Sequence, residues 1–427
     1  MKNLTKEHKE QFNSIFNDLS KALDISESQY KVITDSYQAV GTWLAEGTQI
    51  KSLVPEIRPQ GSFLLGTTIK PINPNDDIDI DLVCELRNKP YNWTQYNLKE
   101  SVGNRIKEHT TYSQMLEKQK GGRRCWTLLY RQNADAKEKF HLDILPCFIE
   151  DARQIIWEQI SFDNAIPSDK FGIRITDNQK VDYKTSTDIT TWLKSNPIGY
   201  AQWFYQRAIT HQMRLFSLRE AIQPVPKYQQ EKYPLQRIVQ ILKRHRDIMF
   251  QGNENKPISI IITTLAAKAY QGENIVEGLY NIVHTMDKYI ENRNGIYWIS
   301  NPINDKENFA DKWEEAPIKR KNFFDWKDRL QKDVDAILST LGMYAIQDSL
   351  TQPFGRDLII ETFSARAKEL KSLRDSNNLK MMTTGVLSTA ASIPVKPHTF
   401  YGKDRGAHTP TGSTKSVAKT NMSRTKD

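Results

Sequence analysis

The sequence predicts an α+β protein in which a mixed sheet, with helices packed on one side, is followed by a mainly helical lobe. The sheet is indicated by segments 78–86 and 140–147, where apolar residues alternate with acidic or polar ones in the two-residue period of a half-buried strand. The helical lobe is indicated by residues 198 to about 290, where apolar residues recur at helical spacing. A chain of 427 residues can bury a sizeable core and divides into two or more structural units.

The remaining elements are expected in chain order around these segments. Ser26 and Gln29 can form the capping box of a helix that ends near Gly47. Its apolar face recurs at Tyr30, Ile33, Tyr37, Val40 and Leu44. Further strands are expected at 57–62 and 125–131, a helical segment at 93–119, and two helices at 326–341 and 357–374.

Two carboxylates lie on one face of the strand 78–86. Successive side chains of a strand point to opposite faces, so Asp79 and Asp81 share one face. The opposite face carries the apolar residues Ile78, Ile80, Leu82, Cys84 and Leu86. Like charges at this distance repel each other unless a cation lies between them, and Mg²⁺ prefers oxygen ligands. Asp77 with Asp79 is the rival pair; Asp79 with Asp81 is preferred because apolar residues flank both.

A third carboxylate, Asp143, lies on the strand 140–147 and faces away from the core together with His141. If the two strands pair, the three carboxylates can hold two metal ions about 3.5–4 Å apart, which is the arrangement that promotes nucleotidyl transfer. Gly61 allows close approach of the backbone to phosphate groups, and the hydroxyl of Ser62 can donate a hydrogen bond to their oxygens. The sequence therefore predicts a nucleoside triphosphate site built around divalent metal.

Several motifs resemble those of the bacterial cGAS/DncV-like nucleotidyltransferases (CD-NTases of the SMODS type), which belong to the DNA polymerase beta-like superfamily. The main motifs are QGSFLLGT at 60–67, DIDIDLV at 77–83 and HLDILP at 141–146. The similarity continues at 196–200, 234–237, 242–247, 256–259 and 395–402. It therefore extends over most of the chain.

The resemblance implies a polymerase beta-like nucleotidyltransferase lobe and a helical C-terminal lobe on either side of a central cleft. Residues 1–195 would form the catalytic lobe with N-terminal helices, and residues 196–300 the helical lobe that closes the cleft. Residues 301–401 would form a sensor-like helical segment, and 402–427 a disordered basic tail. The β-branched run 260–264 favours a strand by propensity, but its continuation and the resemblance favour a buried helix.

The resemblance also implies roles for individual residues. Asp79 and Asp81 would bind two Mg²⁺ ions, with Mn²⁺ as an alternative, and Asp143 would bind one of them and help to deprotonate the acceptor hydroxyl. The substrate phosphates would be held by Gln60, Gly61, Ser62, Lys243 and Ser259. Lys243 lies on a predicted helix whose apolar face is formed by Leu235, Ile238, Val239 and Leu242.

The function implied by the resemblance is template-independent synthesis of a cyclic oligonucleotide second messenger in bacterial antiphage (CBASS) signalling. The substrates would be ATP and other nucleoside triphosphates, and an adenine-containing trinucleotide is the favoured product. Further partners would be regulatory proteins of the defence operon and a separate effector that binds the product. Two alternatives remain: a linear oligonucleotide synthase or RNA-tailing enzyme, and a catalytically inactive nucleotide-binding regulatory protein.

Composition is consistent with a cytoplasmic protein. The three cysteines, Cys84, Cys125 and Cys147, lack metal-ligand spacing and are expected to be reduced thiols, while no membrane span or signal peptide is evident. The net charge is +9, but residues 402–427 carry six basic and two acidic side chains, so much of the excess lies in the tail. No basic and aromatic platform is evident, and no stable nucleic-acid partner is expected.

Overall fold

The computed structural model describes residues 4–47, 50–72, 76–118, 120–130, 139–149, 172–209 and 227–378, with short strands at 380–381, 387–388 and 393–394. The chain forms two compact units, one spanning Leu23–Val334 and the other combining the chain up to Ala22 with the chain from Asp335 onward. The boundaries expected near residues 195 and 300 both lie within the larger unit. The expected basic tail at 402–427 lies outside the described residues.

The larger unit contains a six-stranded mixed sheet, which confirms the predicted fold class. The strand order is β1-β2-β4-β5-β6, and β3 pairs with β4 beside this path. Strands β2 and β4 are parallel, whereas the other pairs are antiparallel. The strands span β1 (Glu56–Pro59), β2 (Ile78–Leu86), β3 (Trp126–Tyr130), β4 (Phe140–Ile149), β5 (Ile173–Ile175) and β6 (Leu193–Ser195).

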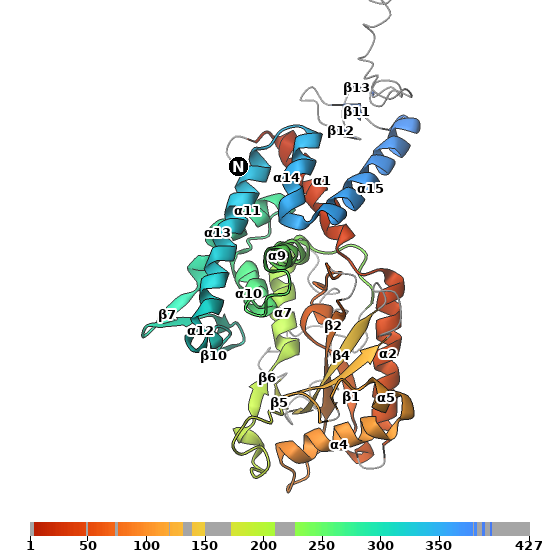
Figure 1. Cartoon of the computed structure of the whole chain (residues 1–427), viewed down its shortest axis with the longest axis vertical. Coiled ribbons are helices and arrows are strands. Elements are labelled where there is room, and N and C mark those ends of the chain that lie inside the picture. The colour runs from red at the N-terminus through yellow and green to blue at the C-terminus, as the bar shows by residue number, and fades with distance from the viewer. Residues whose placement is uncertain are drawn as a thin grey trace, which may run out of the picture. The chain divides into compact units, whose positions relative to one another are not determined.

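One face of this sheet is covered by α2 (Glu27–Ala45), α4 (Gln95–Glu108) and α5 (Thr110–Met115), as Figure 1 shows. The capping box of Ser26 and Gln29 at α2 is confirmed. The expected helical segment 93–119 is two helices, because His109 is extended and its ring accepts a hydrogen bond from the Tyr112 amide. The core between helices and sheet includes Val40, Leu98, Ile80, Leu142 and Trp126.

The expected strand 57–62 ends early, which corrects the prediction for Ser62. Strand β1 stops at Pro59, and the chain turns at Gly61, whose φ of +57° is in the left-handed region. A short helix, α3 (Gly61–Leu64), follows at once, so Ser62 lies in a helical turn and not on a strand.

The helical lobe of the larger unit is confirmed in the described segments 197–209 and 227–289. It contains α7 (Pro197–Ala208), α9 (Pro234–Phe250), α10 (Ser259–Ala269), α11 (Ile275–Thr285) and the 3₁₀ turn η6 (Met286–Tyr289). Residues 261–264 are buried within α10, as expected from the resemblance. The apolar face predicted for α9 is buried too, at Leu235, Ile238, Val239 and Leu242.

Short elements that the sequence did not predict follow this lobe. Two antiparallel pairs join β7 (Glu291–Arg293) to β8 (Ile296–Trp298) and β9 (Ser300–Asn301) to β10 (Asn304–Asn308). The first pair turns at Asn294 and Gly295, both with positive φ, which is the preferred chemistry of a two-residue hairpin. Smaller elements of the unit are η1 (Lys51–Leu53), η4 (Ile189–Thr191) and α12 (Lys312–Glu315).

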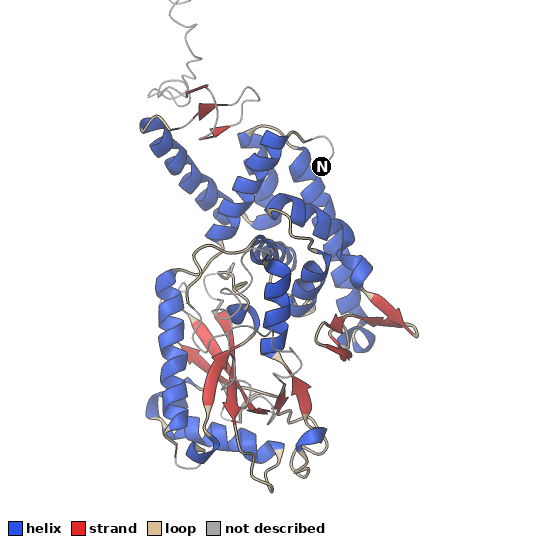
Figure 2. Cartoon of the chain, turned by 180° about the vertical axis from the view of Figure 1, so that it is seen from behind, coloured by secondary structure: helices blue, strands red, loops and turns tan. Residues whose placement is uncertain are grey.

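The smaller unit is mainly helical in its described part (Figure 2). It contains α1 (Lys6–Ala22), α14 (Met343–Phe354), α15 (Arg356–Asp375) and the short strands β11 (Lys380–Met381), β12 (Leu387–Ser388) and β13 (Ile393–Pro394). The boundary between the units lies within α13 (Pro317–Ser339), which begins nine residues before the expected helix 326–341. The expected helix 357–374 is confirmed as α15, whereas α14 was not predicted. No helix among the described residues is long and apolar enough to cross a membrane.

Candidate active site

Strands β2 and β4 bring the predicted carboxylates onto one face of the sheet. In their parallel register Asp79 is paired with His141 and Asp81 with Asp143, and side chains at paired positions point to the same side. The opposite faces of both strands carry buried apolar side chains such as Ile80 and Leu142. The burial of that apolar face therefore determines that the acidic side chains point away from the core.

Three of these side chains form a compact group of potential metal ligands. One ligand atom from each of Asp79, His141 and Asp143 lies within 4.8 Å of the others. The Nε2 atom of His141 is 3.0 Å from Oδ1 of Asp79, and the hydroxyl of Thr127 on β3 donates a 2.5 Å hydrogen bond to Oδ1 of Asp143. Asp77 lies farther away, with its Oδ2 atom 3.9 Å from Nδ1 of His141. Asp81, which competes with Asp77 as the partner of Asp79, is paired with Asp143 in the strand register.

Several acidic groups lie close together on this face, and both their burial and their mutual charges shift their pKa values. Burial, reinforced by the charges of Asp79 and Asp143, raises the pKa of Asp81 to about 7. Burial also raises the pKa of Asp143, although the hydrogen bond from Thr127 opposes the shift. Burial disfavours the charged form of His141, but the hydrogen bond to Asp79 and the nearby carboxylates together raise the pKa of the ring. Repulsion between the carboxylates is the smaller cause of the raised pKa values of Asp81 and Asp143, and a bound cation would relieve it.

A cavity of about 940 Å³ opens onto the acidic face. Its lining includes six of the eight residues predicted for the site, namely Gly61, Ser62, Asp79, Asp81, Lys243 and Ser259. Asp143 is not a lining residue, but one of its carboxylate oxygens lies within 4.8 Å of a carboxylate oxygen of Asp79, which lines the cavity. Gln60 does not line the cavity; its backbone N–H donates a 2.8 Å hydrogen bond to the carbonyl of Asp81 and so attaches the Gly61–Ser62 turn to β2.

Gly61 lies against the carboxylate of Asp81, and Ser62 lines the same cavity. A Cβ atom on Gly61 would collide with the Asp81 carboxylate, so both the positive φ and the lack of space require glycine at this position. The hydroxyl of Ser62 is 3.1 Å from that of Thr68. Strand β1, the turn at Gly61 and helix α3 therefore place a small hydroxyl beside the acidic face.

Lys243 enters the cavity from α9 as a buried cation. The residue is only 4% exposed, and its ammonium donates hydrogen bonds to the carbonyl and hydroxyl oxygens of Thr67 at 3.1 and 3.3 Å. Among the described residues no carboxylate lies within 4 Å of this ammonium, and burial lowers the pKa of Lys243 to about 7. A buried ammonium held only by neutral oxygens is well suited to meet an anion.

Ser259 and one unpredicted neighbour complete this side of the cavity. Ser259 is the first residue of α10, and its hydroxyl accepts a 2.9 Å hydrogen bond from Arg246 of α9. Sequence reasoning did not single out Arg246 for the site, nor did it assign a role to His141. The two-residue spacing of His141 and Asp143 on an alternating strand was the available signal for the histidine.

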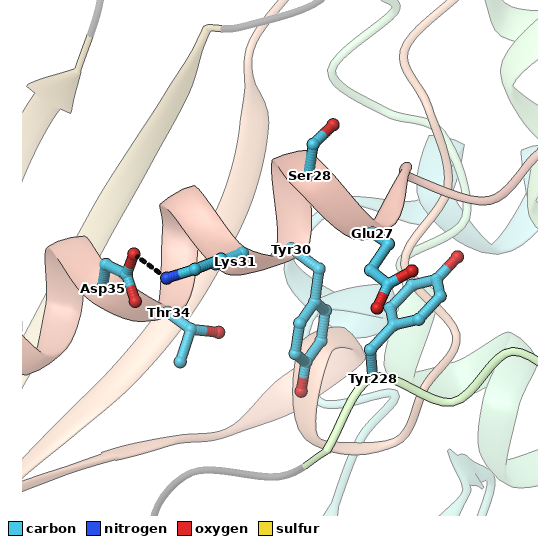
Figure 3. Close-up of a pocket in the computed structure, with 7 residues that line it drawn as sticks. All are labelled: Glu27, Ser28, Tyr30, Lys31, Thr34, Asp35 and Tyr228. Atoms are coloured by element: carbon cyan, nitrogen blue, oxygen red, sulfur yellow. Dashed lines mark hydrogen bonds and ion pairs between the residues drawn. The ribbon is translucent and has the colours of Figure 1, made fainter.

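A second, shallower cavity of about 530 Å³ lies over α2 and contains none of the predicted site residues. In Figure 3 the Tyr30 ring projects from α2 beside Tyr228, and Lys31 pairs with Asp35 at 2.6 Å. The Tyr30 ring stacks on Phe63 with 4.7 Å between the ring centroids. Since Phe63 follows Ser62 in α3, this stack anchors the apolar side of α3 to α2.

Comparison with known proteins shows which family the chain resembles. Residues 11–159 match the model of the Second Messenger Oligonucleotide or Dinucleotide Synthetase (SMODS) domain. The chain is 30% identical over 410 residues to the c-di-GMP synthase of Roseivirga ehrenbergii, and the match covers 93% of this chain and 99% of the relative.

Solved structures of low sequence identity share the fold. The Bradyrhizobium diazoefficiens CD-NTase CdnG, solved in complex with GTP, has a TM-score of 0.62 at 17% identity and covers 83% of this chain and 99% of its own. The Vibrio cholerae cyclic AMP-GMP synthase DncV, solved with a linear intermediate, has a TM-score of 0.51 at 16% identity, with 83% and 91% covered. The chain belongs to the cGAS/DncV-like nucleotidyltransferases and is a cyclic oligonucleotide synthase that joins nucleoside triphosphates and releases pyrophosphate.

Proposed function

We propose that this chain condenses two molecules of GTP into cyclic di-GMP. The observation that carries the proposal is the relative named c-di-GMP synthase, which is 30% identical over nearly the whole of both chains. The neighbour CdnG, which shares the fold, was solved in complex with GTP. These relatives favour a guanine dinucleotide over the adenine-containing trinucleotide suggested by the sequence motifs.

The acidic residues fit a pair of divalent cations, for which Mg²⁺ is proposed and Mn²⁺ is the alternative. Asp79, Asp81 and Asp143 supply hard oxygen donors on one face of the sheet, and the side chain of Asp79 is 61% exposed at the cavity. When bound, such ions lower the pKa of an attacking hydroxyl and neutralise charge on the leaving pyrophosphate. The raised pKa of Asp81, caused mainly by burial and by its acidic neighbours, supports a site that a cation completes.

The triphosphate is proposed to lie between α3 and α9. Ser62 offers a hydroxyl from one side of the cavity and Lys243 a buried ammonium from another, while Ser259 lines the same space. Gly61 keeps the approach to Asp81 open because it has no side chain. Gln60 acts through its backbone bond to Asp81, which holds the turn in place.

The chemical step is a displacement at the α-phosphate. The ribose hydroxyl oxygen of one nucleotide forms a bond to the α-phosphorus of the other, and its proton passes to the Asp143 carboxylate. The bond between the α-phosphorus and the bridging oxygen breaks, and pyrophosphate leaves with the electron pair. The hydrogen bond from Thr127 to Oδ1 fixes the orientation of Asp143 for this role. A second, intramolecular displacement closes the ring and releases the second pyrophosphate.

The biological role is proposed to be bacterial antiphage signalling of the CBASS type, in the cytoplasm, where the cyclic product activates a separate effector. This part of the proposal is supported by membership of the family and by no individual side chain of the chain.

Product analysis tests the proposed substrate. Purified protein with Mg²⁺ and GTP alone is expected to form a phosphatase-resistant product with the mass of cyclic di-GMP, and adding ATP, CTP and UTP is expected to leave that product dominant. Mass spectrometry identifies the product. An adenine-containing ring would overturn the assignment of GTP. Phosphatase-sensitive chains would indicate a linear synthase, and no incorporation would indicate a regulatory nucleotide-binding protein.

His141 is expected to orient Asp79 for metal binding. Replacing it with Ala removes the 3.0 Å contact to Oδ1, and loss of such a partner typically costs about 10–100-fold in metal affinity. The dissociation constant of Mn²⁺, measured by electron paramagnetic resonance without substrate, is therefore expected to rise in His141→Ala. His141→Gln keeps an N–H donor and should lose less, while His8→Ala, in α1, serves as the control. Unchanged Mn²⁺ affinity in His141→Ala would contradict this role.

A further inference from the structure

Helix α9 holds the segment 64–70, which begins two residues after Ser62, through a row of side chains. Each donates a hydrogen bond to a backbone carbonyl of that segment. The pairs are Gln236 to Leu65 at 2.9 Å, Gln240 to Thr68 at 2.9 Å, Lys243 to Thr67 at 3.1 Å and Arg244 to Lys70 at 2.6 Å. An irregular buried segment needs partners for its carbonyl groups, and here one helix supplies them.

The four donors form a polar stripe on α9. Counted from Gln236, they stand at positions i, i+4, i+7 and i+8, which lie on one side of a helix. Gln236 and Gln240 are both 0% exposed, and the side-chain amide of each donates a hydrogen bond to this segment. Neither amide is hydrogen-bonded to the acidic residues of β2 and β4. Buried glutamines at such spacing are expected to serve a specific set of hydrogen bonds, because an unpaired buried amide is costly.

The segment is shaped to receive the Gln236 amide. Gly66 has a φ of +65°, and a Cβ atom at this position would lie 2.5 Å from Nε2 of Gln236. The hydroxyl of Tyr205, from α7, donates a 3.1 Å hydrogen bond to the preceding carbonyl of Leu64. The turn at Gly66 therefore lets the backbone approach α9 more closely than any residue with a side chain could.

Gln240 is fixed in its orientation from both sides. Its Nε2 atom donates to the carbonyl of Thr68 and also to Oδ1 of Asp24 at 2.7 Å. Asp24 is itself held by ion pairs with Lys232 and Arg237, each at 2.5 Å. Both amide hydrogens of Gln240 are thus used, and the buried ionic cluster prevents the side chain from turning away.

The held segment is bonded to Ser62. The hydroxyl of Thr68 is 3.1 Å from the hydroxyl of Ser62, and the amide of Thr67 donates a 2.9 Å hydrogen bond to the carbonyl of Ser62. Lys243, which lines the same cavity, projects from the same helix as the two glutamines. Helix α9 therefore carries the Lys243 ammonium and also fixes the backbone segment that is bonded to Ser62. These are the two groups proposed to face the phosphates.

We propose that Gln236 and Gln240 are positioning residues for triphosphate binding, which hold the Ser62 hydroxyl and the Lys243 ammonium at a fixed separation. The inference rests on the proposed roles of Ser62 and Lys243 and deepens them. A site ordered in advance loses less conformational entropy when the triphosphate binds, so its affinity is higher. The carboxylates of β2 and β4, which carry out the chemical step, remain in place without the two glutamines.

Steady-state kinetics of Gln236→Leu and Gln240→Leu test this inference. Each variant is expected to raise the KM for GTP about tenfold, which corresponds to about 1.4 kcal/mol, with kcat changed less than about twofold. The dissociation constant of the non-hydrolysable GTP analogue with an α,β-methylene bridge should rise by the same factor in isothermal titration calorimetry. Gly66→Ala, which displaces the Gln236 amide from the other side of the contact, is expected to produce the same shift.

Gln95→Leu is the matched control. Gln95 is also 0% exposed, and its side chain accepts a 2.9 Å hydrogen bond from the backbone of Asp177, outside the cavity. We expect this variant to lose similar thermal stability while keeping the wild-type KM. If the variants of Gln236, Gln240 and Gly66 show no larger KM change than Gln95→Leu, the glutamines are merely structural and the inference is wrong.

A double-mutant cycle separates this inference from the proposed function. If Gln240 acts through Ser62, the effects of Gln240→Leu and Ser62→Ala on the KM should be smaller in combination than their sum. Additive effects would overturn the inference while leaving Ser62 in the site. If Ser62→Ala and Lys243→Met leave GTP affinity unchanged, the proposed triphosphate site itself is wrong.

Discussion

Asp143→Asn is expected to lower the rate of cyclic product formation by about 10³-fold or more, with little change in fold. The substitution removes the negative charge from a carboxylate proposed to bind metal and to accept the hydroxyl proton. Metal ions contribute several kcal/mol to the stabilisation of such transition states, and about 4 kcal/mol corresponds to 10³-fold in rate. Radiolabelled GTP with quantification of the phosphatase-resistant product measures the effect.

The stability of Asp143→Asn distinguishes a lost ligand from a damaged fold. Burial raises the pKa of Asp143, so its charged form is less favourable in the folded protein than in the unfolded chain. A neutral amide of the same shape can still accept the hydrogen bond from Thr127, so the melting temperature should be unchanged or higher. Asp188→Asn, at an exposed cap outside the cavity, should retain full activity. Near-normal turnover of Asp143→Asn would refute the proposed metal site.

Lys243→Met is expected to raise the KM for GTP about 10- to 100-fold. A hydrogen bond to a charged group is worth about 1.5–3 kcal/mol, and the substitution removes the buried ammonium proposed to meet the triphosphate. Lys99→Met provides the control, because Lys99 is also a buried lysine, 1% exposed, whose ammonium bonds backbone carbonyls outside the cavity. Equal KM changes in the two variants would remove Lys243 from the proposed site.

The pH dependence gives Lys243→Met a second readout. Burial lowers the pKa of Lys243 to about 7, so the free enzyme loses this positive charge as the pH rises through 7. An anion favours the charged form, and the KM for GTP in the wild type should therefore rise above pH 7, whereas the variant should lack this component. Between pH 7 and the ordinary lysine value of 10.5 the unfolded chain binds more protons, so the stability of the wild type should increase with pH. In Lys243→Met this increase should be smaller.

The position of the carboxylates on one face of the sheet was predictable, because it depends on the alternation of apolar and acidic residues along each strand. In β2 the two-residue alternation leaves Asp79 and Asp81 opposite an apolar face, and in β4 it does the same for Asp143. Both apolar faces must be buried against the same helices, which brings the two strands together. The capping box at Ser26 is local too, and α2 begins where that motif predicts.

Other parts of the site depend on contacts between residues far apart in the chain. The contact between His141 and Asp79 exists only in the register that β4 adopts on β2, and the sequence does not specify register across such a separation. The expected strand through Ser62 is wrong because the chain turns at Gly61, whose φ is positive, and continues as helix α3. The roles proposed for Ser62, Lys243 and Ser259 remain predictions, although the structure brings all three to one cavity.

By itself the sequence determined the class of fold and the acidic motifs that identify the family, because periodicity and short motifs are properties of neighbouring residues. Only the tertiary structure decided how α9 meets the segment after Ser62. Gln236 and Gln240 have ordinary helical positions in the sequence, and the carbonyl groups that they bind lie about 170 residues away. Hydrogen bonds of this kind form only when folding has brought the helical lobe beside the segment 64–70, so no local pattern in the chain reports them.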